Sequence, residues 1–254
     1  MTDAATTADP PLRLKLVPIL VAAVLGFGIP IAAAICTAIA IKLGHLAIAP
    51  GSNVAWLTAQ HTFQLLLALV AIFILKRWLV PADYGLHWPR GKSYILPAIV
   101  WGTVLAMLVA AGSAWLHTMM HIPQTADSIT YTGANVWGWS LFEWLYVGPT
   151  EEIPFRALLV TYLAATMPGR LRIGRFAMNW AGIIVALLFA LAHIQSFWTV
   201  NWADALVQQV YAFVLGVAYA YWLEKSKSVV APIVAHNLTD GLTIVFWALG
   251  VFQA

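Results

Sequence analysis

Seven long apolar stretches follow one another along the chain, separated by short polar segments. Several reach the roughly 20 residues that a helix needs to cross a hydrocarbon core, and none alternates in polarity as the strands of a membrane barrel do. We therefore expect an all-α fold, a polytopic transmembrane bundle of about seven spans. The expected spans cover residues 16–41, 54–75, 94–115, 136–167, 180–197, 205–223 and 229–252.

The fourth stretch is too long for one straight crossing. It contains Gly148, Pro149 and Pro154, and a proline inside a helix removes a backbone hydrogen bond and bends the axis. We therefore predict that this span breaks or kinks near these residues.

Composition agrees with a membrane protein, since 62% of the residues are hydrophobic and 9% are charged, against about 25% charged in soluble domains. Residues 1–12 are rich in Thr, Ala and Asp and are typical of a disordered tail. We expect residues 13–254 to form one transmembrane domain, with a motif-bearing core in 136–252. The single cysteine, Cys36, excludes an internal disulfide.

Basic residues collect in alternate loops, which predicts the orientation of the chain. Only Lys42 lies in a loop of the opposite set, and Arg156 lies inside a span. An odd number of spans with a cytoplasmic N-terminus follows, and we expect an integral protein of the bacterial inner membrane. Because the basic residues are distributed by topology and do not gather into one patch, we exclude nucleic acid as a partner. The remaining basic residues, all on the predicted cytoplasmic side, are Arg13, Lys15, Lys76, Arg77, Arg90, Lys92, Arg170, Arg172, Arg175, Lys225 and Lys227.

The fourth span carries the densest group of charges. A charge near the bilayer centre costs about 3 kcal/mol or more, so it needs a partner or a water-filled cavity. Glu152 and Arg156 are four residues apart and can form an ion pair on one helical face. Glu151 points about 100° away and must find another partner or face water. The cluster is therefore either a general base held beside an ion pair or a purely structural ion pair.

Two further spans carry polar groups at helical spacing. Phe189 and His193 share one face of the fifth span, and His236 and Asp240 share one face of the seventh. Each pair has a structural explanation, namely a buried core histidine and a local hydrogen bond. These polar groups are nevertheless costly in a bilayer unless they have polar partners. We therefore expect the fourth, fifth and seventh spans to converge on one buried site.

The motifs EExxxR, FxxxH and HxxxD, each on its own hydrophobic helix, resemble the CaaX-processing and bacteriocin-processing (CPBP, or Abi) family of intramembrane peptidases, which includes the type II CaaX prenyl endopeptidases. The resemblance covers about residues 148–240. Ala157 is a departure, because many members have glycine after the arginine. The resemblance implies that the catalytic residues are Glu151, Glu152, Arg156, His193, His236 and Asp240, with the Glu152 and Arg156 pair holding the site in place.

The resemblance also implies a mechanism. Glu151 would act with His193 to activate a water molecule that attacks the scissile carbonyl. His236, oriented by Asp240, would help to stabilise the oxyanion. A positioned base and an oxyanion donor are the usual contributors to such a reaction.

The same residues allow a zinc-dependent alternative. Two histidines and a carboxylate form a known catalytic ligand set, so Glu151, His193 and His236 are the candidate zinc ligands. No compact HExxH motif is present. We favour the metal-free mechanism slightly over zinc, although the family is often called metalloproteases.

The expected substrate is a membrane-embedded or lipidated peptide, such as a prenylated protein or a peptide precursor. Two alternatives use the same buried polar groups. One is a small transporter with an intramembrane proton relay, against which we find neither an inverted repeat nor paired broken helices. The other is a non-catalytic binding or immunity protein of the same fold, against which the intact catalytic positions argue.

Other polar residues within the spans include His61, Gln64, Glu143, Gln208 and Gln209. We expect these five to make hydrogen bonds between helices. Glu143 lies eight residues before Glu151 on roughly the same side of its helix, where it could line an access path to the site.

The charge asymmetry gives a topological prediction. In a Cys36→Ser background, a cysteine at position 130 should react with a membrane-impermeant reagent added outside intact cells, and a cysteine at position 174 should not. The reverse labelling pattern would contradict the predicted orientation.

Overall fold

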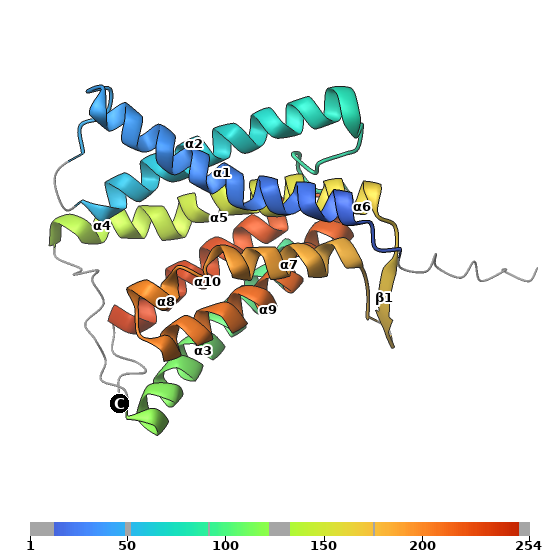
Figure 1. The fold of residues 1–254 in the computed structure, drawn as a ribbon. Helices are drawn as coiled ribbons and strands as arrows, with labels where there is room; N and C mark the ends of the chain where they lie inside the picture. Colours follow the sequence, from blue (N-terminus) through green and yellow to red (C-terminus); the bar gives the residue numbers. More distant parts are fainter. Residues whose placement is uncertain (1–12, 49–51, 91, 122–132, 175, 249–254) are drawn as a thin grey trace, which may run out of the picture.

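The computed structural model describes residues 13–48, 52–90, 92–121, 133–174 and 176–248, and the expected tail of 1–12 lies outside them. Within the described residues the chain is a bundle of helices (Figure 1), which confirms the all-α membrane fold. The regular helices are α1 (Leu16–Lys42), α2 (Asn53–Ile74), α3 (Ile95–Met120), α7 (Trp180–Ala192), α8 (Ser196–Thr199), α9 (Trp202–Ser226) and α10 (Val230–Ala248).

Five described helical segments are long and apolar enough to cross a membrane: Leu16–Lys42, Asn53–Leu79, Ile95–Met120, Trp180–Thr199 and Trp202–Ser226. They match five of the expected spans to within a few residues at most ends. The two other expected spans correspond to α10 and to an irregular helical segment between Gly133 and Thr166.

The irregular segment is the predicted kinked span. It runs through α4 (Gly133–Leu141), η2 (Phe142–Tyr146), α5 (Val147–Glu152), η3 (Ile153–Val160) and α6 (Thr161–Thr166), where η2 and η3 are π-helical. Wider π-helical turns change the direction in which later side chains point, and they are frequent at functional sites. The span therefore changes its helical geometry on both sides of the two adjacent glutamates.

Proline explains part of this irregularity. Pro154 has no N–H group, so it cannot bond the carbonyl of Thr150 in the usual helical pattern. Gln64 of α2 supplies the missing donor, with its Nε2 2.9 Å from the Thr150 oxygen. A backbone carbonyl exposed at membrane depth is thus satisfied by a neighbouring helix.

Two details differ from the expected fold. A short antiparallel hairpin, β1 (Arg170–Ile173) and β2 (Phe176–Asn179), follows the fourth span where we expected an irregular loop. The fifth span is also not continuous, since α7 ends at Ala192 and a turn around His193 separates it from α8. His193 consequently lies at the end of a helix.

Small residues let the helices approach closely. A Cβ added to Gly216 of α9 would lie 2.9 Å from the Cβ of Ala186 on α7, and one added to Gly102 of α3 would lie 3.1 Å from the carbonyl oxygen of Ala235 on α10. Such contacts replace the hydrophobic effect as the main source of helix association in lipid. As a result α7 packs on α9, and α10 packs between α3, α9 and α5.

The broken segment lies in the middle of this bundle. In Figure 1, α1 and α2 lie on one side of the run from α4 to α6, and α7, α9 and α10 lie on the other. Contacts with α2, α7 and α10 enclose the part that carries the glutamates and the arginine. The fold thus brings the three motif helices together and adds α2 to them.

Candidate active site

A fully buried ion pair stands at the centre of the site. Arg156 Nε lies 3.1 Å from Glu152 Oε2, and both side chains have no exposed surface. The pair has the i, i+4 spacing that predicted it. The contact does not have hydrogen-bond angles, and the guanidinium nitrogens make no hydrogen bond with any described residue. Charge attraction rather than a bidentate hydrogen bond therefore joins these two groups.

Aromatic rings surround the guanidinium of Arg156. Its central carbon is 4.2 Å from the ring centroid of Phe189, 5.4 Å from that of Tyr219 and 5.9 Å from that of Phe155. A desolvated cation over the face of a ring gains about 2 kcal/mol. Phe189, the first residue of the second motif, therefore does more than fill space, because it contacts the cation directly.

His236 lies between several carboxylates. Its Nδ1 is 2.7 Å from Glu152 Oε1, and its Nε2 is 3.1 Å from Asp240 Oδ2 and 3.8 Å from Glu151 Oε2. Tyr219 stacks on the ring, with centroids 5.3 Å apart. Since a carboxylate oxygen accepts hydrogen bonds, both ring nitrogens must donate, which requires a proton on each of them. His236 and its carboxylates together therefore hold one proton more than they would if the imidazole were neutral.

Glu151 differs from its neighbour in exposure. Its side chain is 15% exposed whereas that of Glu152 is fully buried, as expected if one of two adjacent carboxylates faces water. One oxygen of Glu151, Oε1, lies 3.2 Å from Nε2 of His61 on α2. The other, Oε2, points toward His236.

His193 differs from His236 in the partners of its two ring nitrogens. Its Nδ1 is 2.8 Å from the carbonyl oxygen of Phe189, so Nδ1 carries the proton, because a carbonyl can only accept. In the neutral ring Nε2 is then an unprotonated acceptor. No described residue bonds to it, and His193 is close enough to Glu151 for their charges to interact. Among the three histidines near Glu151, only His193 presents a lone pair that can take a proton.

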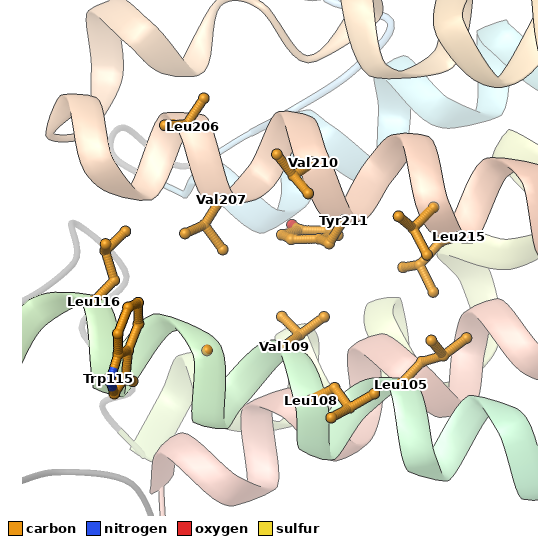
Figure 2. A pocket seen from close by; sticks show the side chains of 12 residues that line it. Leu105, Leu108, Val109, Trp115, Leu116, Leu206, Val207, Val210, Tyr211 and Leu215 are labelled. Carbon is orange, nitrogen blue, oxygen red and sulfur yellow. The ribbon is translucent and has the colours of Figure 1, made fainter.

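Glu143 and Tyr211 also belong to this region. Both are close enough to Glu151 and Asp240 for their charges to interact. Tyr211 in addition lines an apolar groove of about 410 Å³ between α3 and α9 (Figure 2). Except for this tyrosine, Trp115 and Gly112, the groove is walled by leucine and valine side chains. Tyr211 is therefore the point where an apolar groove meets the charged site.

The predicted zinc ligands do not form a metal site in this arrangement. Zinc needs three or four donors directed at one point, and no described group of three or more His, Cys, Asp or Glu residues is arranged in that way. Both nitrogens of His236 face carboxylates, so His236 has no lone pair for a metal. The set Glu151, His193 and His236 thus does not fit a zinc ion with these side-chain positions.

Together, the fold and the cluster define a polytopic membrane protein with a buried carboxylate and histidine site. Residues 133–242 match the family described as Rce1-like, type II CAAX prenyl endopeptidase Rce1-like. This match confirms the resemblance seen in the motifs. No curated protein and no solved structure matches the chain.

One contact of the site was not anticipated from the sequence. His61 was expected to bond between helices, as it does, but its partner is Glu151, which it reaches from outside the matched segment. Its position within an apolar span was the available signal, because a buried histidine in a membrane needs a polar partner. The identity of that partner depends on how α2 packs, which local spacing does not reveal.

The buried ion pair yields a stability prediction. Arg156→Ala leaves Glu152 without its cation, at a cost of about 3 to 5 kcal/mol unless the carboxyl group takes up a proton. We expect this variant to lower the melting temperature in detergent more than Glu151→Ala does. Arg156→Lys should fall between wild type and Arg156→Ala, since it keeps the charge but loses the flat stacking surface. Equal shifts in Arg156→Ala and Glu151→Ala would show that the pair does not stabilise the fold.

Proposed function

We propose that this protein is an intramembrane endopeptidase that hydrolyses a peptide bond in a membrane-associated substrate. The observation that carries the proposal is that Glu151, a partly exposed carboxylate, lies within electrostatic reach of His193, whose Nδ1 donates to a carbonyl oxygen and whose Nε2 has no hydrogen-bond partner among the described residues. Two such acceptors can orient and deprotonate a water molecule. The match of residues 133–242 to a protease family supports the same reaction.

In the proposed reaction, a water molecule donates one hydrogen bond to His193 Nε2 and loses its other proton to Glu151. The water oxygen then bonds to the scissile carbonyl carbon, and negative charge develops on the carbonyl oxygen. When the C–N bond breaks, Glu151 returns its proton to the departing amine.

In this proposal His236 keeps the expected part in stabilising the oxyanion, but it acts through its charge and not through a direct hydrogen bond. Its ring faces Glu152 and Asp240, so neither N–H group is directed at a substrate oxygen. Its positive charge would instead offset the charge that develops on the oxyanion, as fixed charges do in a water-excluded site. Asp240 and Glu152 hold the ring in that position.

The groove between α3 and α9 indicates what kind of substrate fits. It is apolar, and Tyr211 connects it to the charged site. We propose that the groove receives a lipid or apolar chain of the substrate while the peptide reaches Glu151. A lipidated peptide in the bilayer fits this arrangement, because it has both an apolar chain and a peptide part.

The central test is cleavage by purified protein of a panel of membrane-proximal peptides, made with and without an isoprenyl chain. We expect cleavage by wild type and a loss of about 10² to 10⁴-fold in Glu151→Gln and His193→Ala, because these changes remove the base and its partner. His236→Ala should retain measurable activity, because it weakens the stabilisation of the transition state without removing the base.

The same assay separates the two chemistries. If water is activated directly, activity survives thorough chelation. If zinc is required, the purified protein contains about one equivalent of metal, and chelation abolishes an activity that zinc then restores. We predict the first result, and stoichiometric zinc lost together with activity in both His193→Ala and His236→Ala would falsify it. Absence of cleavage by wild type would favour a binding protein or a transporter instead.

The groove can be tested by filling it. A Cβ added to Gly112, which lines the groove, meets no atom within 4 Å, so Gly112→Phe can enter the groove without distorting the helix. Because each buried methylene is worth about 0.8 kcal/mol, or roughly fourfold in affinity, we expect KM for the lipidated peptide to rise at least about tenfold. KM for a peptide without the lipid should stay the same.

A matched control is available in Gly28 of α1, whose Cβ position is equally open. Gly28→Phe should leave both KM values unchanged. An unchanged KM for the lipidated peptide in Gly112→Phe would exclude the groove as the binding site for the chain.

A further inference from the structure

His61 is a buried histidine that no sequence motif identifies. It lies on α2, outside residues 133–242, and is 7% exposed. Phe142 packs edge-on against its ring, with centroids 5.1 Å apart. The ring is thus held in one orientation beside the carboxylate of Glu151.

Both ring nitrogens of His61 face acceptors. Nδ1 is 3.0 Å from the carbonyl oxygen of Leu57, and Nε2 is 3.2 Å from Glu151 Oε1. The carbonyl can only accept, so Nδ1 carries a proton. In a neutral ring Nε2 would then present its lone pair to a carboxylate oxygen, which is repulsive. The contact is favourable only if the His61 and Glu151 pair holds one further proton.

We propose that His61 is a positioning residue for the base Glu151, whose Oε1 it holds through the contact with its Nε2 at 3.2 Å. This inference rests on the proposed function. Since His61 occupies Oε1, the other oxygen, Oε2, is the one that accepts the proton of the attacking water. The pair takes up that proton and returns it to the departing amine, so no other reactant is needed.

The charges of the site support this role. The carboxyl groups of Glu143, Glu151, Glu152 and Asp240 all lie within electrostatic reach of His236, and among the described residues Arg156 is the one arginine or lysine that pairs with any of them. A buried carboxylate in such a group needs a donor that holds it in place, and His61 provides one for Glu151. The ionisable groups within electrostatic reach of Glu151 are His61, His193, His236, Glu143 and Tyr211. Glu152 and Asp240 contact His236, and Arg156 contacts Glu152.

Two amide variants separate the two contacts of His61. The amide nitrogen of glutamine can occupy the position of Nε2, so His61→Gln keeps an N–H group directed at Glu151. The amide nitrogen of asparagine can occupy the position of Nδ1, so His61→Asn keeps only the bond to Leu57. Thr62→Val is the matched control, because Thr62 of α2 bonds the hydroxyl of Tyr146 in η2, on the same irregular span as Glu151, at 2.6 Å.

The test measures kcat and KM for the peptide that wild type cleaves fastest, after thermal unfolding has shown that each variant is folded. We expect His61→Asn to lower kcat about tenfold to a hundredfold with KM unchanged, because a bound substrate meets a misplaced base. His61→Gln should recover most of this loss. Thr62→Val should stay within about twofold of wild type.

Three results would overturn the inference. A wild-type kcat in His61→Asn would mean that Glu151 needs no partner on α2. Equal losses in the glutamine and asparagine variants, with raised KM, would mean that His61 only fills space. Cleavage by none of the proteins, wild type included, would instead refute the proposed function on which the inference rests.

Discussion

The structure depends on how buried charges are matched where water cannot solvate them. Glu152 and Arg156 are both completely buried in a helix at membrane depth, where an isolated charge of either sign would be prohibitive. Their attraction alone does not satisfy the guanidinium, so aromatic rings from η3, α7 and α9 cover it. The need of Glu152 and Arg156 for partners thus determines which helices pack around their span.

The irregular span links this requirement to the chemistry. Prolines prevent a regular helix, and the freed carbonyl of Thr150 is bonded by Gln64 from α2. The amide of Gly148 is bonded by Asn237 from α10 at 2.7 Å, and a side chain at position 148 would collide with that amide group. The same bonds that repair the broken helix therefore hold α2 and α10, with their histidines, against Glu151. The contacts that satisfy the broken helix are therefore also the contacts that assemble the site.

Much of this could be predicted from the sequence because it depends on local periodicity. The span boundaries follow from runs of apolar residues, and the Glu152 and Arg156 pair follows from a spacing of four. The three motifs predicted the family whose model matches residues 133–242. These features require only that helices form and that buried charges find partners.

The remainder depends on packing over long sequence distances. His61 and Glu151 are separated by 90 residues, and no local pattern relates them. The π-helical turns, the hairpin after the fourth span and the helix end at His193 were likewise outside the reach of hydrophobic patterning. The roles of the histidines also needed the structure, because the partner of each ring nitrogen determines where its protons lie.

That assignment of protons is the centre of the account, and nitrogen-15 NMR of histidine-labelled protein in detergent or nanodiscs at neutral pH tests it most directly. Single substitutions would assign the signals of His61, His193 and His236. The account predicts that both nitrogens are protonated in His61 and His236 and that His193 keeps one unprotonated nitrogen. An unprotonated nitrogen in His61 or His236, or a fully protonated His193, would contradict it.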